Sequence, residues 1–224
     1  MEIYVDTANL EHIRQAAELG FISGVTTNPS LLAKEDPMVD IKERILEIHR
    51  LIGGHLSVEV ISTKKEGMLK EVDDILKWFP EATIKIPVIP EGLAAVKELS
   101  RQDVPTNVTL IFSPLQALAA QEAGATYVSV FMGRLDDIST NSNDVIYDVC
   151  EIWDVNGYNS KIIAASIRHP IHVLEAAKAG ADIATVPYNV IMQMLKHPLT
   201  DKGLQQFLDD YDKLQTERQK LISL

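Results

Sequence analysis

The segment TIKIPVIPEG, Thr83 to Gly92, contains the pattern that decides the fold of this chain. Its β-branched residues predict a short buried strand over Thr83–Ile86, and the prolines that follow end this strand. Lys85 interrupts the apolar run, although lysine is almost never fully buried unless it is paired. Because side chains alternate along a strand, Lys85 lies on one face, and Ile84 and Ile86 lie on the other.

The same succession of a strand and a helix recurs along the whole chain. Eight β-branched runs are expected to form strands: Ile3–Asp6, Gly24–Thr27, Leu56–Val60, Thr83–Ile86, Thr106–Ile111, Tyr127–Phe131, Lys161–Ser166 and Asp182–Val186. Amphipathic segments follow them: Leu10–Leu19, Ile41–Leu51, Lys64–Trp78, Glu91–Leu99, Pro114–Ala123, Asn143–Asp154, Ile171–Ala179 and Val190–Leu195. Strands that alternate with helices predict a parallel sheet.

Two observations favour a closed barrel over an open sheet. Glycine follows helical segments at Gly20, Gly124 and Gly180, where a left-handed residue commonly ends a helix. The last two are 56 residues apart, which is two of the 28-residue units obtained when the 224 residues are divided by eight. An open doubly wound sheet would usually carry a glycine-rich loop after the first strand, and none follows Asp6. We therefore predict an α/β fold, a (β/α)8 TIM barrel that forms one domain over residues 1–224.

A further helix is expected after the barrel, over residues 201–221. Its apolar side chains recur at positions i, i+3, i+4, i+7 and i+10, which lie on one face of a helix: Leu204, Phe207, Leu208, Tyr211 and Leu214. The other faces are charged or polar. We expect the apolar face to pack on the barrel of the same chain or on a neighbouring subunit.

The composition excludes several classes of partner. With 32 acidic and 21 basic residues the chain has a formal net charge of -11, which argues against nucleic acid or an anionic membrane as the main partner. Cys150 is the only cysteine, so no internal disulfide can form, and its apolar neighbours favour a buried thiol. No stretch approaches the roughly 18 apolar residues of a membrane span, and the N-terminal residues lack a signal-peptide pattern. A cytoplasmic location is expected.

Polar residues occur at or just beyond the ends of the predicted strands, which is where barrels of this kind place their chemistry. They comprise acids, amides, hydroxyls and cations, with one aromatic residue among them: Asp6, Asn28, Glu59, Lys85, Asn107, Thr109, Ser129, Phe131, Arg134, Ser166 and Arg168. The eighth strand, which ends at Val186 and Pro187, offers little. Taken singly, most of these residues also have a structural interpretation.

The structural alternatives are specific. Asp6 could cap the helix that begins near Leu10. Thr109 and Ser166 could hydrogen-bond backbone groups, and Arg168 could cover a helix end. Arg134 lies close in sequence to two aspartates and could form a surface ion pair of little energetic value.

Lys85 carries the clearest chemical signal. Desolvation disfavours an ammonium, and an unprotonated lysine amine attacks carbonyl groups to form a Schiff base. The structural alternative is an ion pair with Glu59 inside the barrel. The two interpretations are compatible, because a Schiff-base lysine needs an acid or base nearby.

We expect no catalytic metal and no cofactor. The six histidines are scattered, and His169 and His172 are separated by Pro170 at the start of a predicted helix. The sequence contains no HExxH or CxxC motif, no P-loop and no dinucleotide fingerprint.

With these residues identified, the chain resembles the transaldolase family in its short form, over essentially its whole length. The matching segments are YVDTANL, GVTTNPSLL, IKIPVIPEGLAA, NVTLIFSPLQA, SVFMGRLDD, AASIR and HPLTD. The fructose-6-phosphate aldolases are close relatives in the same family. They share the barrel and the lysine, but they release the three-carbon unit instead of transferring it.

The resemblance implies roles for the catalytic residues. Lys85 would form a Schiff base with the C2 ketone of a ketose phosphate, such as fructose 6-phosphate or sedoheptulose 7-phosphate. Asp6 would take the proton of the C4 hydroxyl as the C3–C4 bond breaks, and would return a proton to the acceptor aldehyde. Glu59 would act through a water held with Thr109 during imine formation and hydrolysis.

The resemblance also implies how substrate is bound. Hydroxyl groups of the three-carbon unit would be held by Asn28 and Asn107, with Ser129 beside that unit. The phosphate would be bound by Arg134 and Arg168, together with Ser166. Relatives of the short form assemble as rings of five, often paired into ten, so a homo-oligomer is expected. Small sugar phosphates are the other expected partners.

Position 131 separates transfer from release. In the aldolase branch a tyrosine typically stands where this chain has Phe131, and a glutamine where it has Glu59. The tyrosine hydroxyl helps water release the intermediate, which Phe131 cannot do. We therefore predict a transaldolase of the non-oxidative pentose phosphate pathway. The alternatives are a fructose-6-phosphate aldolase, another Schiff-base aldolase whose lysine usually comes from a later strand, and a non-catalytic sugar-phosphate-binding barrel.

Overall fold

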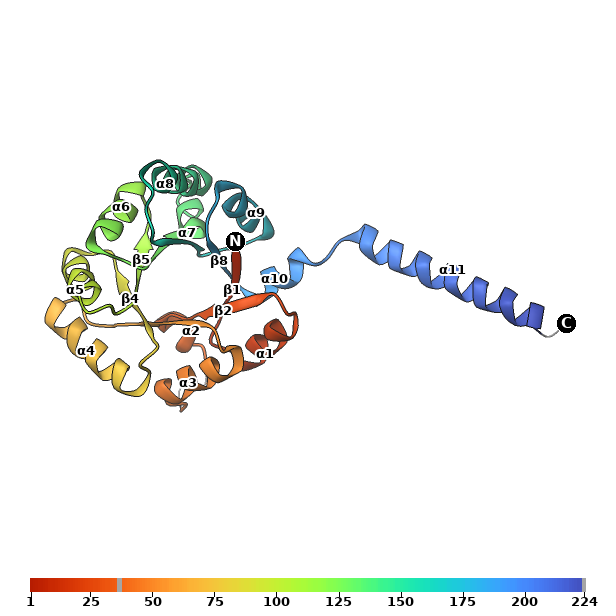
Figure 1. Ribbon diagram of the computed structural model, residues 1–224, viewed down its shortest axis with the longest axis horizontal. Helices are drawn as coiled ribbons and strands as arrows, with labels where there is room; N and C mark the ends of the chain where they lie inside the picture. The colour runs from red at the N-terminus through yellow and green to blue at the C-terminus, as the bar shows by residue number, and fades with distance from the viewer. Residues whose placement is uncertain (36–37, 223–224) are drawn as a thin grey trace. The chain divides into compact units, whose positions relative to one another are not determined.

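A computed structural model describes residues 1–35 and 38–222 of the chain. Eight parallel strands form a closed barrel in chain order, in which β8 pairs with β1 (Figure 1). The strands are β1 (Glu2–Asp6), β2 (Ile22–Thr26), β3 (His55–Glu59), β4 (Thr83–Pro87), β5 (Thr106–Ile111), β6 (Tyr127–Phe131), β7 (Lys161–Ala165) and β8 (Ile183–Val186). The predicted (β/α)8 barrel is confirmed, and each predicted strand is present to within two residues at either end.

Helices surround the strands, as the ring of ribbons in Figure 1 shows. They are α1 (Leu10–Glu18), α2 (Pro29–Leu32), α3 (Ile41–Ile52), α4 (Lys65–Trp78), α5 (Pro90–Ser100), α6 (Pro114–Ala123), α7 (Met132–Asp136), α8 (Ser142–Asn156), α9 (Pro170–Ala179), α10 (Tyr188–Met194) and, after the barrel, α11 (Pro198–Ile222). The amphipathic pattern predicted all of them except α2 and α7. These two helices are too short to show a helical period in the sequence.

Side-chain alternation separates the packing face of β4 from its chemical face. Ile84 and Ile86 are fully buried, whereas Lys85 lies on the opposite face and is 6% exposed. Lys85 is in register with Glu59 on β3 and with Asn107 on β5. Because residues in register on parallel strands point to the same side of a sheet, these three polar side chains meet inside the barrel.

The chain divides into two compact units, one over Met1–Ile191 and one that begins at Met192. The second unit contains α11, which confirms a helix over the predicted residues 201–221 and extends it to Pro198 and Ile222. None of the five apolar side chains on one face of α11 is buried by its own unit. Packing of α11 on the barrel or on a neighbouring subunit, and hence a single domain over residues 1–224, stays a prediction.

Composition led us to expect a buried thiol at Cys150 and no membrane-spanning stretch. Cys150 is buried, and burial, assisted by the charge of Asp182, raises the pKa of its thiol to about 12. The thiol is therefore protonated at neutral pH and behaves as a core residue. Among the described residues, no helix has the length and apolar character needed to cross a membrane.

Candidate active site

A cavity of about 310 Å³ opens where the strands of the barrel end. Its walls come from the ends of several strands and from the loops and short helices that follow them. The predicted site residues that line it are Asp6, Asn28, Lys85, Ser129, Phe131, Arg134, Ser166 and Arg168. Glu59, Asn107 and Thr109 are not part of its lining, although they lie on strands next to Lys85.

Lys85 is held by two partners. Its Nζ lies 2.9 Å from Glu59 Oε2 and donates a hydrogen bond to the backbone carbonyl oxygen of Thr27 at 3.1 Å. The ion pair inside the barrel, expected as the structural alternative, is therefore present. It also serves chemistry, because a carboxylate at this distance can accept a proton from the lysine before the amine attacks a carbonyl group.

Asp6 enters the cavity from the end of β1. Its carboxylate accepts a hydrogen bond from the Thr26 hydroxyl at 2.8 Å, and the Thr26 hydroxyl is also hydrogen-bonded to that of Thr185. Thr26 has one hydroxyl proton, so Thr185 must donate to Thr26 when Thr26 donates to Asp6. Burial raises the pKa of Asp6 above its ordinary value, although the Thr26 hydrogen bond and the charge of Lys85 act in the opposite direction.

Thr26 and Thr185 were not among the predicted site residues. Thr26 is in register with Asp6 on the neighbouring strand, and strand alternation could have identified it. The expectation that the eighth strand offers little was wrong, because Thr185 lines the cavity and is hydrogen-bonded within it. Thr185 precedes the last residue of β8, so the rule that chemistry lies at strand ends does not select it.

Asn107 lies beside the cavity and acts through its neighbours. It is fully buried, its Nδ2 donates to Ser57 Oγ at 3.1 Å, and its Oδ1 accepts from the Ser129 hydroxyl at 2.7 Å. Ser129 does line the cavity. Because its proton is directed to Asn107, its oxygen is left to accept a hydrogen bond from a bound molecule.

Thr109 is fully buried, and its hydroxyl has no hydrogen-bond partner among the residues that the structure describes. It is in register with Pro87, two residues beyond Lys85 on β4. A buried hydroxyl without a partner is costly, and such a group commonly holds an ordered water. Position and chemistry therefore suit the water-holding role that the family resemblance implies.

Asn28 follows β2 at the mouth of the barrel. Its side-chain oxygen accepts a hydrogen bond from the backbone N–H of Leu31 at 2.9 Å and so caps α2, which begins at Pro29. The amide N–H groups of Asn28 remain available as donors toward the cavity that it lines. Capping thus orients the side chain and leaves its donors free for substrate oxygens.

Two guanidinium groups stand at one side of the cavity. Arg134 on α7 lies over the ring of Phe131 at 5.2 Å, and the edge of Phe131 packs on Phe112 at 5.6 Å between ring centroids. Arg168, in the loop after β7, pairs with Asp137 at 2.9 Å. Within the described part of the chain, Arg134 forms no ion pair with either aspartate expected as its alternative partner, and those aspartates pair instead with His172 and Arg168.

A tight backbone contact brings the two arginines together. Ser166 has a φ of 57°, which is unusual for a residue with a side chain, and its carbonyl oxygen accepts the N–H of Gly133 at 3.0 Å. A Cβ at position 133 would lie 2.2 Å from that oxygen and 2.6 Å from Cγ of Arg168. Only glycine permits this approach of α7 to the loop after β7.

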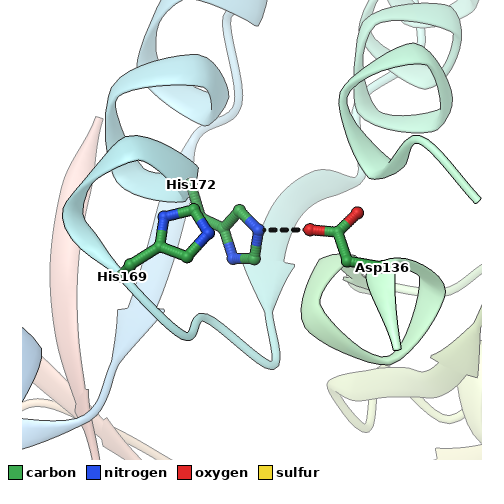
Figure 2. Close-up of side chains that lie close together, drawn as sticks. All are labelled: Asp136, His169 and His172. Carbon is green, nitrogen blue, oxygen red and sulfur yellow. Dashed lines mark hydrogen bonds and ion pairs between the residues drawn. The ribbon is translucent and has the colours of Figure 1, made fainter. Parts of the chain in front are cut away.

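Asp136, His169 and His172 form a cluster beside the arginines (Figure 2), with potential ligand atoms within 4.8 Å of one another. His172 Nε2 lies 2.6 Å from Asp136 Oδ2, and His172 Nδ1 accepts the backbone N–H of Arg168 at 3.2 Å. Since Nδ1 is an acceptor, the proton of the neutral ring resides on Nε2 and is donated to Asp136. Both nitrogens of His172 are thus occupied, which makes the cluster poorly suited to a metal ion.

The fold and the site together define a class of protein. It is a (β/α)8 barrel in which Lys85 pairs with Glu59, and a second carboxyl group and two guanidinium groups line the same cavity as Lys85. Such a site combines an amine nucleophile, a group for proton transfer and cations that bind an anion.

Comparison with known proteins gives the family. The family model described as Transaldolase/Fructose-6-phosphate aldolase matches residues 3–222. A probable transaldolase of Clostridium botulinum (strain Eklund 17B / Type B) is 58% identical over 212 residues, which cover 95% of this chain and 98% of the relative. A probable transaldolase of Moorella thermoacetica is 55% identical over 217 residues, which cover 97% of this chain and 100% of the relative. The chain belongs to the transaldolase/fructose-6-phosphate aldolase family, which confirms the resemblance seen in the sequence.

Because burial raises the pKa of Asp6, replacing its ionised carboxylate with a neutral group should stabilise the folded chain. The folded chain binds the carboxyl proton of Asp6 more tightly than the unfolded chain does, in which the pKa of an aspartate is about 3.9. Stability is therefore lost as the pH rises from that value through the folded-state pKa. Asp6→Asn should raise the free energy of unfolding at pH 7, and the gain should shrink as the pH is lowered toward 4. Urea denaturation at several pH values measures the gain in free energy of unfolding at pH 7 and its decrease at lower pH.

Asp74→Asn is the control with the opposite sign. Asp74 is exposed on α4, and its hydrogen bond to Lys77 lowers its pKa. Its ionised form is therefore favoured in the folded chain, so the substitution should slightly reduce stability at pH 7. Equal effects of the two substitutions would contradict the assignment of a raised pKa to Asp6.

Proposed function

We propose that this chain is a transaldolase. It would transfer a dihydroxyacetone unit from a ketose phosphate, such as sedoheptulose 7-phosphate or fructose 6-phosphate, to an aldose phosphate, such as glyceraldehyde 3-phosphate or erythrose 4-phosphate. The contact between Lys85 and Glu59, in which the Nζ of a lysine that lines the cavity lies 2.9 Å from Glu59 Oε2, is the observation that carries the proposal. The close relatives named probable transaldolase support it.

The first step is imine formation on Lys85. Glu59 accepts a proton from Nζ, and the freed amine attacks the C2 carbonyl carbon of the donor. The carbinolamine then loses its hydroxyl group as water when Glu59 returns a proton through a water held with Thr109. The partnerless hydroxyl of Thr109 supports this role. The product is a protonated imine in which C2 is strongly electrophilic.

The second step is cleavage of the C3–C4 bond. Asp6 takes the proton of the C4 hydroxyl, the C4 oxygen becomes an aldehyde oxygen, and the electron pair of the broken bond moves into the protonated imine. Burial raises the pKa of Asp6 and so makes the carboxylate a better base than an exposed one. Proton transfer by a positioned group of this kind contributes about 10²–10⁴ in rate. The reverse sequence on a new aldehyde completes the transfer.

Substrate binding follows the polarity of the cavity. Arg134 and Arg168 are suited to the phosphate, because a guanidinium binds an oxyanion with two parallel hydrogen bonds. Ser166 lines the same part of the cavity. Local cations are needed because the chain as a whole has a net charge of -11. They attract an anion that the rest of the surface would repel.

Hydroxyl groups of the three-carbon unit would be held by Asn28 and Ser129. Asn28 offers amide donors and Ser129 offers an acceptor oxygen, so together they match hydroxyl groups that both accept and donate. Asn107 orients Ser129 and is not itself exposed to the cavity. We therefore propose a positioning role for Asn107 in place of direct contact with substrate.

Fructose-6-phosphate aldolase is the second candidate, because the matching family model covers both activities. The two reactions share every step up to bond cleavage and differ in the fate of the lysine-bound dihydroxyacetone. Phe131 lines the cavity and has no hydroxyl to assist a water in releasing this intermediate. Its ring is packed between Phe112 and the guanidinium of Arg134. These contacts favour transfer.

The remaining parts of the proposal concern context. We propose that the enzyme acts in the non-oxidative pentose phosphate pathway, in the cytoplasm, with sugar phosphates as partners and without a cofactor. We also propose a homo-oligomer, in analogy with the pentamers or decamers of the short-form family, in which the apolar face of α11 is covered. Uncovered, that face would expose five large apolar side chains.

Borohydride trapping tests the chemistry directly. Fructose 6-phosphate with borohydride should add a reduced adduct to Lys85, located by peptide mass, and Lys85→Met should lose both label and turnover. Loss of a covalent nucleophile can lower kcat by about 10⁶. Lys34→Met removes another amine that lines the cavity and should leave Lys85 labelled. An unlabelled wild-type chain would instead indicate a sugar-phosphate-binding barrel.

Position 131 tests transfer against release. Phe131→Tyr should raise the release of dihydroxyacetone from fructose 6-phosphate in the absence of erythrose 4-phosphate, by up to about 10²-fold if the new hydroxyl assists proton transfer to or from water. Phe112→Tyr places a hydroxyl on the neighbouring ring and should have no such effect. Rapid release of glyceraldehyde 3-phosphate by the unmodified enzyme without acceptor would favour the aldolase.

The oligomer is tested on α11. Light scattering of the full chain should give a mass of five or ten times 24.9 kDa. Phe207→Lys places a charge on the apolar face and should lower that mass, because burying an unpaired ammonium is costly. Gln205→Lys adds the same charge to the polar face and should leave the mass unchanged. A monomeric wild-type protein would contradict the proposal.

A further inference from the structure

A chain of hydrogen bonds joins α7 to the backbone of Arg168. Figure 2 shows its first hydrogen bond, between His172 and Asp136. Asp136, the last residue of α7, accepts the Nε2 proton of His172 at 2.6 Å, and Nδ1 of the same ring accepts the N–H of Arg168 at 3.2 Å. His172 itself lies on α9. The imidazole of His172 therefore connects α7, which contributes to the cavity wall, with Arg168, to which we assign phosphate binding.

The chain of hydrogen bonds joins α7 to the loop after β7. Each of these two elements carries one of the arginines to which we assign phosphate binding. Arg134 is on α7, two residues before Asp136, and Arg168 is in the loop between β7 and α9. Two other contacts cross the same gap: the N–H of Gly133 to the carbonyl oxygen of Ser166 at 3.0 Å, and the ion pair of Arg168 with Asp137 at 2.9 Å. That ion pair is exposed, so it constrains the geometry weakly.

The link through His172 is the better fixed of the side-chain contacts. The His172 side chain is 3% exposed, and both of its ring nitrogens are engaged. The other oxygen of Asp136 accepts the N–H of Ser142, the first residue of α8, at 3.1 Å. Burial disfavours the ionised carboxyl, but the hydrogen bonds from His172 and Ser142 outweigh it and hold the pKa of Asp136 below its usual range. The chain of hydrogen bonds is thus anchored on α7, α8 and α9.

His169 does not belong to this chain of hydrogen bonds. Its ring is tilted by 42° against that of His172, with 3.9 Å between centroids, and no side-chain hydrogen bond of His169 is seen among the described residues. A cation held by all three side chains would have to displace the proton on His172 Nε2, while Nδ1 still faces an N–H donor. The geometry therefore favours a hydrogen-bonded brace over a metal site.

We propose that Asp136 and His172 are positioning residues that set the spacing of Arg134 and Arg168, and so determine the preference of the enzyme for phosphorylated donors. This inference rests on the proposed function of the same site. Bidentate recognition of a phosphate by two guanidinium groups depends on their separation and angle. A misplacement of about 1 Å caused by a residue outside the reacting centre can cost about 10²-fold in rate.

Two conservative variants test the brace. Asp136→Asn keeps the shape of a half-exposed side chain, but an amide has one oxygen and cannot accept from both Ser142 and His172. His172→Gln keeps an amide donor that can reach Asp136, but its amide does not reproduce the directions of the two ring nitrogens, so it cannot also accept the N–H of Arg168 in the same geometry. His169→Ala is the control, because it removes the neighbouring ring and breaks none of these hydrogen bonds.

Kinetics with two donors give the readout. In Asp136→Asn and His172→Gln, KM for fructose 6-phosphate should rise by about tenfold, the scale of one lost hydrogen bond to a charged group, with kcat within about twofold. The kcat/KM for unphosphorylated fructose should be unchanged, as should labelling of Lys85 by dihydroxyacetone and borohydride. That labelling also shows that each variant is folded. His169→Ala should resemble the unmodified enzyme in every measurement.

Several outcomes would overturn the inference. Unchanged KM for fructose 6-phosphate in both variants would exclude a positioning role. Equal losses with both donors would show a general structural role without selectivity for phosphate. Loss of activity in His169→Ala, together with inhibition by EDTA that zinc reverses, would show that the cluster binds a metal ion. Failure of the proposed function looks different, because the wild-type chain would then neither cleave fructose 6-phosphate nor be labelled at Lys85.

Discussion

The buried pairing of Lys85 with Glu59 is the constraint on which the rest of the site depends. A lysine that is 6% exposed would be strongly destabilising without a partner, and Glu59 Oε2 at 2.9 Å supplies one. The pair exists because β3 and β4 run parallel with Glu59 and Lys85 in register. The same register places Asn107 on the other side of Lys85. Barrel closure thus converts an unfavourable residue in an apolar strand into the centre of a polar layer.

Near this pair, Asp6 and Thr109 are each held in a form that reduces the stability of the folded chain. Burial raises the pKa of Asp6, so its ionised form is held against the preference of its surroundings. The hydroxyl of Thr109 is buried without a partner among the described residues. Such features concentrate at functional sites, where groups are held ready for proton transfer instead of being fully satisfied. Their grouping at one end of the barrel distinguishes this site from an ordinary buried ion pair.

The side of the cavity that carries Arg134 and Arg168 is built by a different means. It depends on α7, on the loop after β7 and on backbone contacts that only Gly133 permits. Ser166 is held in a left-handed conformation that brings its carbonyl oxygen to α7. The Asp136–His172 link then ties Arg168 to the same helix. Strands therefore carry the groups that we assign to the reaction, while a loop and a short helix carry the groups that we assign to binding.

The sequence by itself determined the eight strand–helix units, the closed barrel and the position of Lys85, because local periodicity and strand alternation are properties of neighbouring residues. It also indicated the polar strand ends, since the rule that chemistry lies there needs only the order of elements. Tertiary structure alone decided which of these groups touch: Thr185 with Thr26, Asn107 with Ser129, and His172 with Asp136 and Arg168. Three of these contacts join residues that are 22 to 159 positions apart. The fourth, between His172 and Arg168, depends on the path of the loop after β7. No local pattern encodes them, because they form only when closure of the barrel and a strained backbone bring separate strands and loops together.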